Sequence, residues 1–205
     1  MLDVGCGTGH MLLRFGSSFQ ELTGVDHSRT MLNAATANLA EKNLKAELIE
    51  TDAISFITEA TQWYDFITCV GFLHHLIPDT IPGVVKRLAK LLAPPAGHIL
   101  IAEPIAVDAP LLPTAIANWN TLSLAARNSY SQMVEDPDEA PISRDLLYDS
   151  LQAAGLKVLV EKRAWEVFPH NDPPSLKDKL MTRYFKFRHR FSGNVMAILA
   201  TPDID

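Results

Sequence analysis

Residues 2–9, Leu-Asp-Val-Gly-Cys-Gly-Thr-Gly, carry the most specific signal in this chain of 205 residues. Asp3 ends a short apolar run, and three glycines follow it at every second position: Gly5, Gly7 and Gly9. Glycine permits positive φ and lets a ligand approach the backbone closely. The next residues, His10 to Phe15, predict a helix whose first N–H groups are free to face a ligand. The stretch therefore predicts a strand, a tight turn and a helix that bind a small molecule together.

The spacing of these glycines differs from that of a nicotinamide-binding site. Such sites prefer Gly-x-Gly-x-x-Gly, whereas this chain has Gly-x-Gly-x-Gly. A dinucleotide pyrophosphate carries two negative charges, so Asp3 would repel it. A ligand that carries an ammonium group would instead be attracted. We therefore disfavour a dehydrogenase and expect a cationic ligand.

Short β-type runs alternate with helix-type runs along the rest of the chain, which is typical of a parallel sheet covered on both faces. We expect strands at residues 1–4, 21–26, 46–51, 64–72, 98–102, 156–168 and 195–201. A helix should begin after the N-cap Ser28 and another after Ser143. The first of these should bury one face, made of Met31, Leu32, Ala35 and Leu39. A third amphipathic helix should include residues 84–92.

Two segments interrupt this alternation. Residues 105–141 are too long for an ordinary loop and have a helical composition in the middle. We interpret them as a helical insertion that forms a lid or a substrate-binding element, with a larger core or a dimer interface as the alternative. Residues 170–192 form a second insertion before the last strand, and they contain a basic cluster at 177–190.

The composition excludes several classes of protein. Hydrophobic residues make up 47% and charged residues 20% of the chain, enough for a sizeable core. The basic cluster has a local charge of +5 in a chain of net charge −6, so the remainder carries −11, which disfavours a general nucleic-acid binder. Neither a signal peptide nor a membrane-spanning helix is predicted. With only two cysteines, Cys6 and Cys69, we expect a reducing, cytoplasmic location and no disulfide framework.

Taken in order, these motifs resemble the class I S-adenosylmethionine-dependent methyltransferases along most of the chain. Residues 64–76 are similar to the family's fourth strand and its exit, and residues 91–100 to the turn into its fifth strand, with Pro-Ala-Gly in place of the commoner Gly-Gly. The resemblance implies a Rossmann-like, doubly wound α/β fold in a single domain over residues 1–205. Its seven-stranded sheet should be mostly parallel, with an antiparallel last strand.

The resemblance also assigns a binding site for S-adenosylmethionine. Asp26 matches the acidic residue that binds both ribose hydroxyls. Asp52 matches the acceptor of the adenine amino group, and the next N–H, from Ala53, would bind the ring. The backbone around Val70 would help to hold the methionine amine. The expected cofactor-binding residues are Asp3, Gly5, Cys6, Gly7, Gly9, Asp26, His27, Asp52, Ala53 and Val70. No metal site is predicted.

Family members usually carry a longer first strand and preceding helices that cover the methyl donor. This chain begins within the expected first strand, so we expect it, as given, to lack that segment.

His74 and His75 follow the expected fourth strand directly, where the acceptor sites of the family open. Imidazole is a common general base near neutral pH, so both are candidate catalytic residues. The alternative is that one ring caps a turn while the other is solvated. Glu103, after the fifth strand, is either a ligand for an acceptor hydroxyl or a satisfied loop carboxylate. The chain lacks the Asn/Asp-Pro-Pro-Tyr/Phe and Pro-Cys motifs after the expected fourth strand, which disfavours adenine or glutamine N-methylation and cytosine C5-methylation.

We therefore predict methyl transfer to a small-molecule acceptor by in-line displacement. Two alternatives remain open. One is an RNA methyltransferase that uses the basic cluster at 177–190, and the other is a methyltransferase-like binding module without activity. The sequence favours no particular acceptor atom and no oligomeric state.

Overall fold

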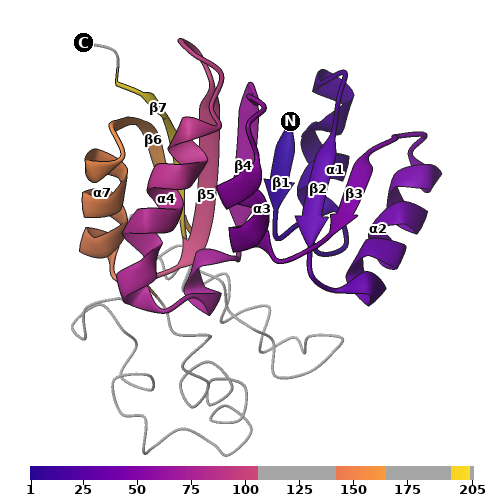
Figure 1. Cartoon of the computed structure of the whole chain (residues 1–205), viewed down its shortest axis with the longest axis horizontal. Helices are drawn as coiled ribbons and strands as arrows, with labels where there is room; N and C mark the ends of the chain where they lie inside the picture. Colours follow the sequence, from indigo (N-terminus) through magenta and orange to yellow (C-terminus); the bar gives the residue numbers. More distant parts are fainter. Residues whose placement is uncertain (106–141, 165–194, 204–205) are drawn as a thin grey trace, which may run out of the picture.

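The computed structural model describes residues 1–105, 142–164 and 195–203, which form a seven-stranded sheet in the order β3-β2-β1-β4-β5-β7-β6 (Figure 1). The strands are β1 (Leu2–Val4), β2 (Thr23–Asp26), β3 (Glu47–Glu50), β4 (Phe66–Val70), β5 (His98–Pro104), β6 (Leu156–Ala164) and β7 (Val195–Pro202). The first five pair in parallel, whereas β7 is antiparallel to both β5 and β6. The predicted mostly parallel sheet with an antiparallel last strand is confirmed.

Helices lie against the sheet in two groups, each with its own apolar cluster. Helices α1 (His10–Phe15) and α2 (Arg29–Glu41) pack together over a cluster that includes Leu12, Leu32 and Leu39. Helices α3 (Ala53–Glu59), α4 (Ile81–Lys90) and α7 (Arg144–Ala153) form a row along the sheet and bury the larger cluster (Figure 1). These two clusters form the core of the doubly wound fold.

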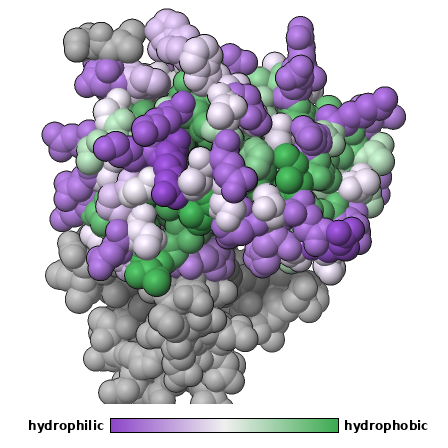
Figure 2. Space-filling view, viewed as in Figure 1, coloured by the Kyte–Doolittle hydropathy of each residue, from purple (hydrophilic) through white to green (hydrophobic). Residues whose placement is uncertain are grey.

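The row of α3, α4 and α7 is amphipathic, as the sequence predicts for α4. Val84, Val85 and Leu88 of α4 are buried, while Lys86 and Arg87 are exposed. Figure 2 shows this side of the molecule with polar residues over most of its surface and apolar residues between them. Burial of one face therefore attaches the helix to the sheet.

Side-chain caps fix where the longer helices begin. Ser28 accepts a hydrogen bond from the Met31 N–H, and Ser143 accepts one from the Leu146 N–H, both at 3.4 Å. Both predicted N-caps are confirmed. The prediction that Met31 belongs to the buried face is wrong, because Met31 is 44% exposed. The buried stripe consists of Leu32, Ala35 and Leu39, and Met31 lies outside it on the first turn of α2.

The register of the parallel strands brings their carboxyl ends to one edge of the sheet. Asp3 of β1 pairs with Gly24 of β2 and with Thr68 of β4, and Val70 pairs with Ala102 of β5. The acidic residues near the ends of β1, β2 and β5 therefore lie along this edge. Open α/β sheets bind their ligands in the crevice outside these ends.

An apolar groove of about 540 Å³ lies elsewhere, near the amino ends of β4 and β5. Its lining residues are Phe15, Phe19, Asp65, Phe66, Ala96, His98, Leu100, Val160 and Leu199. None of the predicted site residues lines this groove. We therefore do not assign the donor site to it.

Most of the two predicted insertions lies outside the described residues. Of the insertion at 105–141 only Ile105 is described, and it forms a β-bridge with Ile142. The insertion at 170–192, with its basic cluster at 177–190, also falls outside the described ranges. In the described part of the chain, no helix is long and apolar enough to cross a bilayer.

Candidate functional site

The glycine turn between β1 and α1 adopts a backbone that favours glycine. Its φ values are 67° at Gly5, 50° at Gly7 and 80° at Gly9. The Cys6 N–H donates to the Val25 carbonyl at 2.9 Å, which ties the turn to β2. A Cβ on Gly5 would lie 2.9 Å from a ring carbon of Phe72, whereas one on Gly7 would have no atom of a described residue within 4 Å. The turn is thus packed at Gly5 and open beside Gly7, where a ligand can approach the backbone.

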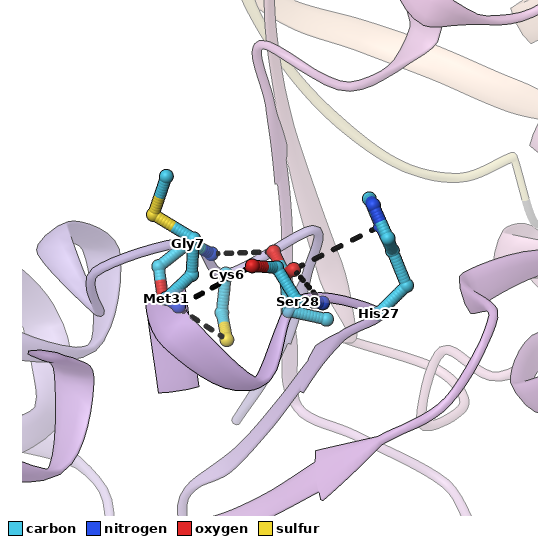
Figure 3. A network of polar contacts seen from close by, with 6 residues as sticks. Cys6, Gly7, His27, Ser28 and Met31 are labelled. Atoms are coloured by element: carbon cyan, nitrogen blue, oxygen red, sulfur yellow. Dashed lines mark hydrogen bonds and ion pairs between the residues drawn. The ribbon is translucent and has the colours of Figure 1, made fainter. Parts of the chain in front are cut away.

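Asp26, at the end of β2, links this turn to the start of α2. Its Oδ2 accepts from the Gly7 N–H and its Oδ1 from the Ser28 N–H, both at 2.8 Å (Figure 3). The side chain of His27 is 87% exposed, with Nδ1 3.9 Å from Asp26 Oδ1. A carboxylate oxygen has two lone-pair directions, so each oxygen of Asp26 keeps capacity for one further donor. Asp26 therefore shapes the turn and can still accept from a diol.

Asp3 is a buried carboxylate beside the same turn. Only 2% of the residue is exposed, and its Oδ1 accepts from the Thr68 hydroxyl at 2.7 Å. Burial raises the pKa of Asp3 to about 7. The Thr68 hydrogen bond opposes this rise in pKa, while the negative charge of Asp26 adds to it. A cation bound here would restore the ionised form, because an opposite charge nearby favours the charged state.

Asp52 and Ala53 lie at the junction of β3 and α3. Asp52 is exposed and caps α3, since its Oδ1 accepts from the Ser55 N–H at 2.8 Å. The Thr51 N–H donates to the Asp26 carbonyl at 3.1 Å, so this junction lies next to the end of β2. Ala53 is buried. Sequence reasoning missed the seven-residue helix α3 itself.

Glu103, in β5, holds the loop that leaves β4. It is 0% exposed, and its Oε1 accepts from the N–H groups of Phe72 and Leu73 at 2.9 and 2.8 Å. Its Oε2 contacts Nδ1 of His74 at 2.7 Å and the His74 N–H at 3.4 Å. Of the two expectations for Glu103, the structure supports the satisfied loop carboxylate, because its oxygens already serve the loop.

The two histidines at the exit of β4 differ in their surroundings. The His74 side chain is mostly buried and held by Glu103, while His75 is exposed. Their rings lie against each other, with centroids 4.0 Å apart. The contact between His74 and Glu103 at Nδ1 leaves Nε2 of His74 as the nitrogen that could accept a proton. Val70 ends β4, and the following residue, Gly71, donates from its N–H to the Ala102 carbonyl at 2.8 Å.

Both cysteines are buried and free. Burial raises the pKa of Cys6 to about 12, and the charges of Asp3 and Asp26 contribute. Burial likewise raises the pKa of the Cys69 thiol. Thiols in this state are poor nucleophiles, so both fit the role of small core residues. The described residues contain no group of three or more His, Cys, Asp or Glu side chains that could hold a metal ion.

The structure thus places the predicted residues in two adjoining groups. Asp3, the glycine turn and Asp26 form one group, with Asp52 beside it; Val70, His74 and Glu103 form the other. The two groups meet where Phe72 packs against Gly5. Sequence reasoning missed Thr68, although a polar residue between Ile67 and Cys69 in an apolar run was a possible signal.

Comparison with known proteins finds similarity to methyltransferases. A family described as "Methyltransferase domain" matches residues 1–95. Ubiquinone biosynthesis O-methyltransferase from Aliivibrio fischeri strain MJ11 is 29% identical over 102 residues, which are 50% of this chain and 42% of that protein. The protein of the same name from Yersinia pestis strain Pestoides F is 30% identical over 50% of this chain and 41% of its own length. The matches therefore span less than half of these relatives.

Solved structures extend the likeness to nearly the whole chain. Magnesium protoporphyrin IX methyltransferase from Synechocystis PCC 6803, with bound SAH, has a TM-score of 0.64 at 12% identity and covers 98% of this chain and 72% of its own. A SAM-dependent methyltransferase from Archaeoglobus fulgidus has a TM-score of 0.59 at 20% identity, with coverages of 98% and 84%. Residues 1–95 thus match the methyltransferase domain family, and the chain shares its fold with solved S-adenosylmethionine-dependent methyltransferases.

Proposed function

We propose that this protein transfers a methyl group from S-adenosylmethionine to a small-molecule acceptor. The observation that carries the proposal is the acidic cluster formed by Asp3 and Asp26 around the glycine turn, which is open beside Gly7. The residues fit the donor, which presents an ammonium group, a positively charged sulfur and a ribose diol. Among the described residues, the buried Asp3 carboxylate has no cationic partner and the backbone is open beside Gly7, and both features complement such a ligand.

The roles of the residues follow from their positions. Asp3 would face the ammonium group, and Asp26 would accept from both ribose hydroxyls with the lone pairs that the backbone leaves free. Asp52 and the Ala53 N–H would bind the adenine. The other expected donor-binding residues are Gly5, Cys6, Gly7, Gly9, His27 and Val70. Because the bound donor would carry its own activated methyl group and a neutral leaving group, the chain need not protonate a leaving group.

His74 would act as the general base on the acceptor. Glu103 fixes the ring through Nδ1 at 2.7 Å, so Nε2 can take a proton from an acceptor hydroxyl. The carboxylate would also stabilise the imidazolium that forms. His75, whose ring lies tilted against that of His74, is the second candidate. The O-methyltransferase relatives support a hydroxyl acceptor. The main rate contribution would come from in-line alignment of the acceptor with the methyl group.

We also propose a reducing, cytoplasmic location. Both cysteines are buried and free, and neither is paired in a disulfide. A reducing compartment is the usual location of such thiols. Alkylation of freshly lysed cells under denaturing conditions would check this, with both thiols expected in the reduced form.

Calorimetric titration with S-adenosylhomocysteine tests the function. Asp26→Ala should weaken binding by about 1–3 kcal/mol, since it removes the partner of buried polar groups. Asp149→Ala, an exposed residue on α7, is the matched control and should bind like the unaltered protein. Unchanged affinity of Asp26→Ala would contradict the assignment. Absence of binding by the folded, unaltered protein would favour a methyltransferase-like module without activity.

A further inference from the structure

We propose that Thr68 is a positioning residue of the donor site: on the proposed function, its hydroxyl holds the Asp3 carboxylate in the orientation that receives the donor's ammonium group. Nothing in the sequence motifs assigns a role to this residue. Its contribution would be to set the lowest pH at which the donor binds well.

The geometry of the pair is specific. Thr68 and Asp3 are direct register partners on the parallel strands β4 and β1. The Thr68 Oγ1 lies 2.7 Å from Asp3 Oδ1 and 3.4 Å from the Leu2 carbonyl. A hydroxyl has one hydrogen to donate, and the shorter contact to the carboxylate identifies its acceptor. Thr68 is 0% and Asp3 2% exposed, so water does not compete appreciably for this bond.

The surroundings make Thr68 the main stabilising contact of the charged carboxylate. Asp26 faces Asp3 from β2, and Cys6 faces it from the glycine turn. Cys69 lies next to Thr68 on β4, and the charge of Asp3 contributes to the raised pKa of its thiol. Within the described residues, no Lys or Arg side chain pairs with Asp3. Burial and Asp26 both raise the pKa of Asp3, and the Thr68 hydrogen bond is what lowers it.

The choice of threonine also fits this role. The neighbours of Thr68 on β4 are Ile67 and Cys69, both fully buried, and valine would fill nearly the same volume as threonine. A buried hydroxyl is costly without a partner. Asp3 supplies that partner, and the exchange of threonine for valine removes one hydrogen bond while it preserves the shape of the strand.

Unfolding of the ligand-free protein tests the coupling directly. Chemical unfolding of the unaltered protein, Thr68→Val and Thr68→Ser would be measured from about pH 5 to about pH 9, each also in an Asp3→Asn background. In Thr68→Val, the titration of Asp3 seen in the stability profile should move up by about one pH unit or more, the size of a hydrogen bond to a charged group. Thr68→Ser should retain the original profile. In the Asp3→Asn background, Thr68→Val should leave the pH dependence unchanged, and a shift there would overturn the coupling.

Binding of S-adenosylhomocysteine over the same pH range tests the link to the donor. Thr68→Val should bind about ten-fold more weakly near pH 7 and approach the unaltered protein at high pH, where Asp3 is ionised in both. An equal loss at every pH would show a merely structural role and overturn the proposal. If the unaltered protein does not bind at all, the proposed function fails, while the unfolding experiment still decides the coupling between Thr68 and Asp3.

Discussion

Each half of the site contains one buried carboxylate, Glu103 or Asp3, and the two differ in how many hydrogen-bond donors surround them. Glu103 has its oxygens within reach of three backbone N–H groups and of the His74 ring. Asp3, almost equally buried, has one side-chain hydrogen bond within the described residues, from Thr68, and a carboxylate neighbour in Asp26. The protein's own groups compensate the burial of Glu103. The burial of Asp3 is compensated only in part, which leaves capacity for a cationic ligand.

At the same edge of the sheet, one buried carboxylate therefore stabilises the structure and the other is available for binding. A fully satisfied buried carboxylate makes a rigid loop, and here it fixes the loop that carries His74. A buried carboxylate with too few hydrogen bonds lowers the stability of the ligand-free protein, and a bound cation would compensate for this. This is the common trade-off between stability and function. We therefore expect substitutions of Glu103 to damage the fold and substitutions of Asp3 to damage binding.

The largest effect is expected for the base that Glu103 positions. His74→Asn should lower kcat by about 10²–10⁴-fold, the usual contribution of general acid–base catalysis. The dissociation constant of S-adenosylhomocysteine should stay within about two-fold, since His74 belongs to the acceptor half. Steady-state kinetics with an accepted substrate and calorimetry would measure the two. His75→Asn is the control. A larger loss of kcat in that variant than in His74→Asn would identify His75 as the general base.

The second-largest effect is expected for removal of the Glu103 side chain. Glu103→Ala leaves three backbone N–H groups and the His74 ring without their acceptor, and it should lower the free energy of unfolding by about 3–5 kcal/mol. Glu103→Gln keeps one oxygen and should lose less. Urea unfolding measures both, with Glu59→Ala, an exposed residue of α3, as the control. A loss below about 1 kcal/mol in Glu103→Ala would contradict the role as loop anchor.

In contrast to Glu103→Ala, the substitution Asp3→Asn should raise the free energy of unfolding of the ligand-free protein. The folded protein holds the Asp3 proton up to about pH 7, whereas the unfolded chain releases it from its ordinary pKa of 3.8. Between these values the folded state binds more protons, so this group makes stability fall as the pH rises. Asp3→Asn removes that loss and should be more stable by about 1–3 kcal/mol above neutral pH. A variant less stable than the unaltered protein under those conditions would show that Asp3 is not destabilising.

Asp52 should give the smallest change. Its side chain caps α3, and Asp52→Ala should cost about 1 kcal/mol, the typical value of an N-cap. Asp52→Asn keeps an oxygen for the Ser55 N–H and should restore most of this stability. Urea unfolding distinguishes the two variants. Equal loss in both would assign the effect to the charge of Asp52 rather than to the cap.

Much of the fold could be predicted from local patterns. The glycine turn, the caps at Ser28 and Ser143 and the amphipathic stripe of α4 are each encoded within a few neighbouring residues. The mostly parallel direction of the strands, with an antiparallel last strand, then followed from their alternation with helices and from the family resemblance, whereas the strand order came from the structure. The short helix α3 escaped prediction because Asp52 was interpreted as an adenine ligand rather than as a cap.

The sequence by itself determined the strands, the glycine turn and the acidic residues that end the strands. Only the tertiary structure decided which of these acids are satisfied. Thr68 reaches Asp3 across 65 positions of the chain, and Glu103 reaches the Phe72 N–H across 31. Such contacts depend on strand register and burial, which no local periodicity contains. The same chemical group, a carboxylate, therefore becomes a structural anchor at Glu103 and, on our proposal, a ligand partner at Asp26 and Asp3.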